Sequence, residues 1–370
     1  MSRLKITRVE TIPLKIPLRI PFATSRAIQK DTRPVLVKLH TDGDIIGIGE
    51  CDPKPHITGE TQASVLAVMR DYLAPALTGY ELSEAADMNR ICVRMDEVLI
   101  SNPSAKAGID IAAHDALGML KGVPVHSILG QKQREALTSL GFSDLGSVRD
   151  ASEEAERHVH GGCTSYKIKV ARNWPSDMER IAAVRRIIGP NMELIIDPNQ
   201  AWTVEESIKI LREFGSDFAA CEQPVPWDDR VGLAEIATAV EAPIMADEAV
   251  WSPSDASTVI HLKAADMVNI KHLKSGGLHR AMQIAKVLQT AGVPCMIGST
   301  VETGISAAAS IHFAIACPGF KYLDVAPPTE FILEDVVEGL AWEGSKVKPN
   351  DTPGLGVTLK DEVVAKYTIS

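Results

Sequence analysis

The sequence predicts an α/β protein in which a closed parallel β/α barrel follows a smaller α+β domain. Three acidic residues recur at intervals of 25 positions, each at the end of a short apolar run: Asp197, Glu222 and Asp247. About 25 residues is the length of one buried strand, one helix and their two loops. The same phase continues in both directions, and it predicts strands that end near Gly141, Lys169, Asp197, Glu222, Asp247, Lys271, Gly298 and Asp324. Eight consecutive units favour a closed barrel over an open sheet.

Composition and charge narrow the class of protein. The chain has 370 residues, 45% of them hydrophobic, which is enough for a large core and two domains. Its net charge of −10, without a basic block, argues against nucleic acid as the main ligand. No apolar stretch reaches spanning length and the N-terminus lacks a signal-peptide core, so we expect no membrane partner and a cytoplasmic location. The six cysteines are scattered without metal-type spacing, and we expect reduced, buried thiols.

The N-terminal third predicts the α+β domain. Residues 1–60 have the alternation of strands, and the Asp-Gly-Asp at 42–44 separates two apolar runs in the manner of a hairpin. Residues 61–121 change to a helical pattern. We therefore expect a three-stranded domain with several helices over residues 1–130.

The barrel is expected over residues 131–335. Thr203 and Glu206 fit a capping box at the start of one helix, and Ser252-Pro253 fits an N-cap followed by proline in the first turn. An open doubly wound sheet would need a glycine-rich phosphate loop, and no GxGxxG or Walker motif occurs. The turn-rich remainder, residues 336–370, is expected to return to the first domain.

The acidic strand ends predict a metal site. Asp197, Glu222 and Asp247 supply three hard oxygen ligands, which favour Mg²⁺ or Mn²⁺ over zinc or copper. Any one of them alone is better explained as a cap of a loop or helix. Three on consecutive strands would repel one another without a cation, which favours the metal. Glu248, next to Asp247, is expected to point elsewhere and to orient a lysine.

Lysines at other strand ends predict acid/base chemistry. Lys167 and Lys169 are two apart, so on a strand their side chains face the same side. Mutual repulsion and burial would lower their pKa values, and a neutral lysine is a base. Lys271 would project from the sixth strand, across the barrel, so that a substrate between the two strands meets an amine on each face. Lys274 is interpreted as a loop residue without a catalytic role.

At these residues the chain resembles the enolase superfamily, and within it the muconate lactonizing enzyme subgroup of the mandelate racemase/muconate lactonizing enzyme family. The resemblance covers nearly the whole chain and is carried by Lys167-x-Lys169, Asp197-Pro-Asn-Gln, Glu222-Gln-Pro, Asp247-Glu248, Lys271 and Pro353-Gly-Leu-Gly. It implies an N-terminal capping domain over a modified (β/α)7β TIM barrel that is often homo-oligomeric. It also implies Mg²⁺ on the three carboxylates and abstraction of a proton α to a carboxylate, through an enediolate. Lys169 and Lys271 would be the two acid/base catalysts, and Lys167 a helper.

The motifs are most similar to those of dipeptide epimerases. Those enzymes carry Asp-x-Asp at the eighth strand end to hold a substrate ammonium, whereas this chain has the single Asp324. Asp324 is therefore either the ligand of one cationic nitrogen or a structural loop acid. Ser299, in the matching seventh-strand run, is a further substrate-binding candidate.

Two capping loops, at about 22–30 and 51–60, would lie over the barrel mouth. Arg26 is a candidate for binding a distal substrate carboxylate, because its planar fork matches that group. Lys54 or His56 could touch the substrate, but each is better interpreted as an ordinary exposed loop residue.

Three hypotheses remain open. The first is a Mg²⁺-dependent racemase or epimerase of an amino-acid-derived carboxylate: a dipeptide, an N-acyl amino acid or a proline derivative. The second is a muconate-type cycloisomerase or a β-elimination dehydratase that uses the same residues. The third, a barrel retained only for binding, predicts the loss of ligands or bases, and all of them are present.

Overall fold

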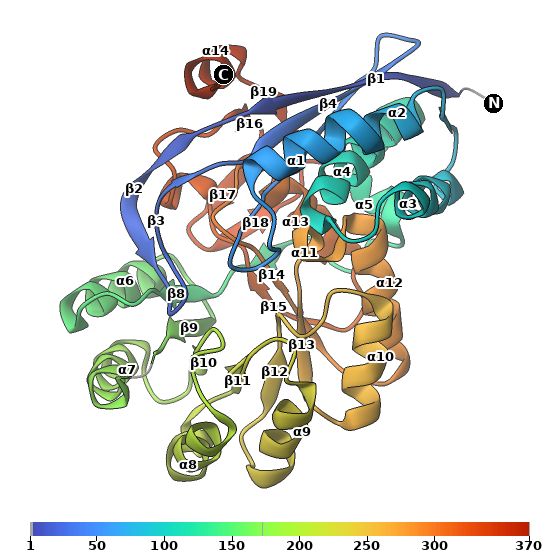
Figure 1. The fold of residues 1–370 in the computed structure, drawn as a ribbon. Coiled ribbons are helices and arrows are strands. Elements are labelled where there is room, and N and C mark those ends of the chain that lie inside the picture. Colours follow the sequence, from blue (N-terminus) through green and yellow to red (C-terminus); the bar gives the residue numbers. More distant parts are fainter. Residues whose placement is uncertain (1–2, 172, 370) are drawn as a thin grey trace.

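The computed structural model describes residues 3–171 and 173–369 (Figure 1). Its N-terminal part contains an antiparallel sheet in the order β5-β4-β1-β6 and a separate hairpin of β2 and β3. The strands are β1 Leu4–Pro13, β2 Ile16–Ala23, β3 Ile28–Thr32, β4 Val35–Thr41, β5 Ile46–Cys51 and β6 Glu81–Leu82. The expectation of three strands is thus wrong for the described residues. The two residues of β6 are too few to show alternation, and β2 and β3 form a two-stranded sheet of their own.

Helices cover one face of this sheet, and the predicted hairpin of β4 and β5 is confirmed. The central helix α4 begins at Pro103, in the first turn where proline is tolerated, and ends before Gly122, whose φ of 65° suits glycine. Its residues 104–118 are buried. The helices of this part are α1 Gln62–Val68, the π-helix η1 Met69–Leu73, α2 Ala74–Leu77, α3 Ala86–Val98, α4 Pro103–Lys121 and α5 Val125–Leu129.

Eight parallel strands form the barrel, in the order β8 to β15 along the chain, as predicted. They are β8 Gly141–Ser143, β9 Ser165–Lys169, β10 Glu193–Asp197, β11 Ala220–Glu222, β12 Ile244–Ala246, β13 Met267–Ile270, β14 Cys295–Gly298 and β15 Phe320–Asp324. A single bridge between Ser139 and Leu323 closes the ring. Only the first strand differs clearly from its predicted end, because Gly141 begins β8. A Cβ there would lie 2.7 Å from the Tyr166 ring, so glycine marks a close approach and not a turn.

The helices of the barrel surround the strands in Figure 1. They are α6 Val148–His160, α7 Trp174–Ile188, α8 Val204–Phe214, α9 Arg230–Ala239, α10 Pro253–Leu262, α11 His272–Ser275, α12 Leu278–Thr290 and α13 Gly304–Ala316, with 3-10 turns η2 Gly215–Asp217 and η3 Pro328–Glu330. Both predicted caps are confirmed: Thr203 and Glu206 form a capping box, and Ser252 caps α10, which starts at Pro253. None of the described helices is long and apolar enough to cross a membrane.

The C-terminal segment ends beside the first strand of the chain. Its elements are β16 Val337–Glu338, β17 Ala341–Glu343, β18 Lys346–Lys348, β19 Thr358–Leu359 and α14 Asp361–Tyr367, and β18 pairs with β7 Leu137–Thr138. Ile369 N–H then donates to Pro13 O at 3.0 Å. The six cysteines are free and buried, as predicted.

Candidate active site

The barrel interior is built in two levels. The lower level is mostly apolar, and its apolar members are Leu140, Ile195, Ala220, Met245, Met267, Met296 and Tyr322. Alternate residues of a strand face the same side, so the side chains two positions further on lie inside the barrel at its C-terminal end. These positions carry Phe142, Asp197, Glu222, Asp247, Asn269, Gly298 and Asp324. Polar chemistry is therefore concentrated above an apolar plug.

The three predicted metal ligands are fully buried, and each accepts from a lysine. Lys169 Nζ lies 2.5 Å from Asp197 Oδ2, and Lys271 Nζ lies 2.7 Å from Asp247 Oδ2. Lys167 Nζ lies 3.2 Å from Glu222 Oε2. The predicted carboxylates and lysines are thus brought together.

The two lysines of β9 differ in depth. Lys167 is level with Ile195 of the lower layer, and Lys169 is level with Asp197 of the upper layer. The side chain of Lys167 is accordingly 4% exposed and that of Lys169 is 13% exposed. Lys169 therefore reaches the mouth of the barrel, while Lys167 lies beneath it.

The charges of this cluster shift the pKa values of its members. Burial, and next the carboxylate of Asp197, raises the pKa of Glu222 to about 8. Burial opposes the charged form of Asp247, yet Lys271 and Lys274 outweigh it and hold its pKa below the usual range. Burial also opposes the charged form of Lys167, but the carboxylates around it raise its pKa. The expectation of a lowered pKa for Lys167 is therefore wrong, because its nearest charged partners are carboxylates.

Two residues of the cluster were missed by sequence reasoning. Lys274 is fully buried on α11, and its Nζ lies 2.7 Å from Asp247 Oδ1 and 3.1 Å from Asn269 O. Its interpretation as a loop residue is therefore wrong. Asn269 Nδ2 donates to Glu222 Oε1 at 2.6 Å. The sequence signal for Asn269 was a polar amide side chain within the otherwise apolar run of β13.

The donor set matches the chemistry of a hard divalent cation. In this structure the three carboxylates form ion pairs with lysines. Within residues 3–171 and 173–369, no three His, Cys, Asp or Glu side chains lie close enough together to form a metal site. The three carboxylates are nevertheless close enough for Asp197 and Asp247 to raise the pKa of Glu222. Carboxylate oxygens on adjacent strand ends are the ligands that Mg²⁺ uses.

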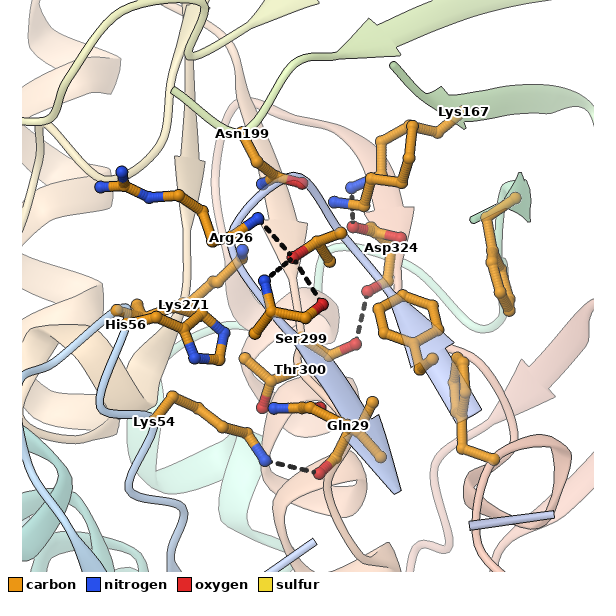
Figure 2. A pocket seen from close by; sticks show the side chains of 18 of the residues that line it. Arg26, Gln29, Lys54, His56, Lys167, Asn199, Lys271, Ser299, Thr300 and Asp324 are labelled. Carbon is orange, nitrogen blue, oxygen red and sulfur yellow. Dashed lines mark hydrogen bonds and ion pairs between the residues drawn. The ribbon is translucent and has the colours of Figure 1, made fainter. Parts of the chain in front are cut away.

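A pocket opens above the cluster, between the barrel and the β2–β3 hairpin. Figure 2 shows Lys167, Lys271, Ser299 and Asp324 around it, and Lys169 also lines it. Lys169 ends β9 and Lys271 directly follows β13, four strands apart in the ring of eight. The two amines therefore approach the pocket from opposite sides of the barrel.

The three substrate-binding candidates all line this pocket. Arg26 is exposed at the rim, and its Nη2 donates to Gln200 Oε1 at 3.1 Å. None of the ion pairs among the described residues involves Arg26. Asp324 forms an ion pair with Lys167, and Ser299 Oγ donates to Asp324 O at 2.8 Å. Asp324 is thus already paired with the ammonium of Lys167, while the guanidinium of Arg26 has an amide partner and lies at the rim of the pocket.

The second capping loop differs from its predicted character. Lys54 is 3% exposed, and its Nζ lies 3.1 Å from Thr32 Oγ1, 3.0 Å from Val301 O and 2.8 Å from Asp52 Oδ1. It is therefore a buried connection between the capping sheet and the barrel. His56 is half-buried and lines the pocket, and burial lowers its pKa to about 4.

Glu248 also faces the pocket, contrary to the expectation that it points elsewhere. It is 3% exposed, and its Oε2 has no hydrogen-bond partner among the described residues. Burial, followed by the charge of Asp247, raises its pKa.

The chain matches two family models. The model described as "Enolase C-terminal domain-like" matches residues 150–363. The model described as "Mandelate racemase / muconate lactonizing enzyme, N-terminal domain" matches residues 6–130.

Two curated relatives cover almost the whole chain. An L-Ala-D/L-Glu epimerase of Clostridium acetobutylicum is 33% identical over 93% of this chain and 96% of its own. Muconate cycloisomerase 1 of Rhodococcus opacus is 31% identical over the full length of both.

Solved structures agree with these matches. The N-succinyl Arg/Lys racemase of Bacillus cereus superposes with a TM-score of 0.94 at 31% identity, over 99% of this chain and 98% of that one. The dipeptide epimerase of Enterococcus faecalis, solved with Mg and the dipeptide L-Leu-L-Tyr, has a TM-score of 0.90 at 29% identity, over 96% and 99%. The chain therefore belongs to the mandelate racemase/muconate lactonizing enzyme family of the enolase superfamily, and it is an isomerase.

Proposed function

We propose that this chain is a Mg²⁺-dependent racemase or epimerase that inverts the α-carbon of an amino-acid derivative. The placement of Lys169 and Lys271 carries the proposal, since they line one pocket from opposite sides of the barrel. A substrate held between them meets one amine on each face. Proton removal by one and proton return by the other is what a two-base inversion needs.

Asp197, Glu222 and Asp247 would hold the Mg²⁺. When bound, the ion supplies positive charge that stabilises the negative charge developing on the substrate carboxylate, and it offsets the carboxylates that raise the pKa values of Lys167 and Lys271. The magnesium in the structure of the Enterococcus faecalis relative supports this assignment.

The other residues would orient the substrate. Lys169 removes or returns the α-proton on one face, and Lys271 does so on the other. Lys167, held between Glu222 and Asp324, keeps positive charge at the floor of the pocket. Arg26 would bind a distal carboxylate, because its guanidinium has an amide partner but no acidic partner among the described residues.

A cycloisomerase is the second candidate, favoured by the full-length match to the Rhodococcus opacus enzyme. In that reaction one lysine would transfer the proton and the other would act through its charge. A β-elimination would use the lysines in the same way.

The test is α-proton exchange in D₂O with Mg²⁺, followed by NMR. The compounds are dipeptides, N-acyl amino acids, proline and hydroxyproline derivatives, and cis,cis-muconate. Deuterium at the α-carbon together with inversion is the expected result. Lactone formation or loss of water without exchange would replace the racemase with the second candidate.

Single lysine variants separate the two faces. Lys169→Met and Lys271→Met should each abolish inversion, while each keeps exchange with only one enantiomer. A variant that exchanged both enantiomers at the wild-type rate would contradict the two-base assignment.

A further inference from the structure

Three phenylalanines from distant parts of the chain meet on one side of the pocket. Phe22 comes from β2, Phe142 from β8, and Phe331 follows η3. The rings of Phe22 and Phe331 meet edge to face with centroids 5.5 Å apart, and those of Phe142 and Phe331 stack at 5.1 Å. All three line the pocket, and together they are called the aromatic wall. The chain has only seven phenylalanines, so this is a marked concentration.

The aromatic wall is held in place from behind. The His158 ring lies 4.8 Å from that of Phe142, and Tyr166 Oη donates to Phe142 O at 2.9 Å. The three phenylalanines are still only half-buried. Fixed aromatic faces that line a cavity without being fully covered are surface that an apolar ligand group would bury.

The wall stands in one sector of the barrel mouth. Phe142 of β8 pairs with Lys167 on the neighbouring strand β9. On the other side of β8 the bridge between Ser139 and Leu323 brings β15, and with it Asp324, next to the wall. In this sector the rings of the aromatic wall therefore lie beside the ion pair of Asp324 and Lys167.

That combination disfavours a substrate ammonium. Among the described residues that line the pocket, only Asp324 and Glu248 are acidic. Asp324 is paired with Lys167, and Glu248 follows Asp247 at the end of β12, on the opposite side of the ring. A cation placed against the rings here would lose water and compete with Lys167 for Asp324, which costs free energy. An uncharged apolar group would lose little and cover the rings.

We propose that the aromatic wall determines substrate specificity by binding an uncharged apolar substituent, carried on the α-carbon or on its nitrogen, in preference to an ammonium group. This inference rests on the proposed function, and it narrows the substrate class of that same site. It favours N-acylated amino acids with an aryl or alkyl group over free dipeptides.

Three matched compounds test the charge and the apolar group separately. N-acetyl-alanine is the small one, 3-phenylpropanoyl-alanine adds an aryl group, and phenylalanyl-alanine is the same aryl compound with an added ammonium. The expected kcat/KM for α-proton exchange with Mg²⁺ is about tenfold or more higher for the 3-phenylpropanoyl compound than for either of the others. N-acetyl-phenylalanine against N-acetyl-alanine makes the same comparison for the side chain.

Wall variants connect any preference to these residues. Phe331→Ala and Phe22→Ala should reduce the aryl-over-acetyl ratio about tenfold or more, and they should reduce the rate with N-acetyl-alanine much less. Ile20→Ala is the control, because Ile20 lies on the same strand as Phe22 and is 76% exposed. It should leave the ratio unchanged.

The outcomes are distinguishable. Three results would overturn this inference and leave the proposed racemase intact. The first is exchange that is fastest with phenylalanyl-alanine, and the second is equal exchange with the aryl and the small compounds in both series. The third is an aryl-over-acetyl ratio that the wall variants do not change. Exchange with none of the compounds, and with none of the wider panel, overturns the proposed function and this inference with it.

Discussion

At the scale of single residues, the site is organised by charges that compensate one another inside the protein. Lys167, Lys169, Lys271 and Lys274 are each within 4 Å of a buried carboxylate oxygen. Burying such groups singly would be costly, and burying them as hydrogen-bonded pairs is tolerated. Binding of the proposed Mg²⁺ would therefore require these carboxylates to change partners.

The proposed metal ligands give the most direct residue-scale prediction. Asp197→Asn, Glu222→Gln and Asp247→Asn should each weaken Mg²⁺ binding and lower turnover by orders of magnitude, because each removes a charged oxygen ligand. Isothermal titration with Mg²⁺ and the exchange assay measure the two effects. Unchanged turnover in metal-stripped wild-type protein would refute the metal role.

Gln223 is expected to position the ligands without touching the metal. Its Oε1 accepts from Asp247 N–H at 3.0 Å and Ala249 N–H at 3.1 Å, and its own carbonyl accepts from Gln200 N–H at 2.8 Å. It thereby connects the loops that carry all three carboxylates. Gln223→Met should weaken Mg²⁺ affinity about 10- to 100-fold, as loss of an outer-shell partner does.

A matched glutamine controls for the substitution itself. Gln283 is half-buried on α12, where its side chain contacts His279 away from the site. Gln283→Met should leave Mg²⁺ affinity unchanged. Equal affinities for Gln223→Met and Gln283→Met in isothermal titration would contradict the positioning role of Gln223.

Arg26 is expected to affect binding more than chemistry. Arg26→Ala should raise KM more than it lowers kcat for a substrate with a distal carboxylate, because the contact would be equal in the ground and transition states. Steady-state kinetics against a substrate without that carboxylate provide the comparison. A fall in kcat as large as the rise in KM would show that Arg26 does more than bind the distal carboxylate.

At the scale of elements, strand register decides which side chains meet. The alternation of β10, β11 and β13 places polar residues two positions beyond the apolar plug. At the same level β14 carries Gly298, where a Cβ would lie 2.4 Å from Asn269 Oδ1 and 2.8 Å from Lys271 Cε. The missing side chain thus leaves room for Lys271.

Gly298→Ala tests this close approach. The added methyl group should displace Lys271 and lower kcat about 100-fold, since small misplacements of a catalytic group are costly. Gly43→Ala is the control, because a Cβ there has nothing within 4 Å. Wild-type kcat in Gly298→Ala, at unchanged melting temperature, would show that the gap is not needed.

At the scale of the whole molecule, the N-terminal part holds the barrel loop that lines the pocket. Glu50 of β5 accepts from Thr303 Oγ1 at 2.6 Å and from Ser306 N–H at 3.0 Å, so it caps α13. Lys54 bonds Val301 O in the preceding loop. The division into domains at 130 and 335, a homo-oligomeric state and a cytoplasmic location stay predictions.

A buried histidine predicts part of the pH dependence of stability. Burial lowers the pKa of His312, on α13, to about 4. Its contribution to stability is fully present above the unfolded pKa of about 6.5 and is lost as pH falls towards 4, about 3 kcal/mol in all. His312→Gln should therefore flatten the fall in unfolding free energy over this range by about 1.4 kcal/mol per pH unit.

Urea unfolding at several pH values between 4.5 and 7.5 measures that slope. His261→Gln is the control, because His261 is exposed on α10 in the folded protein. A slope equal to that of the wild type in His312→Gln would contradict the prediction.

Much of the architecture was predictable because it depends on local periodicity. The 25-residue spacing of Asp197, Glu222 and Asp247 gave the strand ends, and the caps at Thr203 and Ser252 gave helix starts. Each of these signals lies within one element or between consecutive ones. The two-residue strand β6 gave no such signal and was missed.

By itself, the sequence determined the barrel, the line of carboxylates and the opposed lysines, because strand alternation and repeat length place side chains without reference to distant partners. Only the tertiary structure decided that Lys274 binds Asp247 and that Phe22, Phe142 and Phe331 share one wall. It also decided the direction of the Lys167 pKa. These properties depend on which groups meet in space, because a pKa or the lining of a pocket is set by neighbours that lie far apart along the chain.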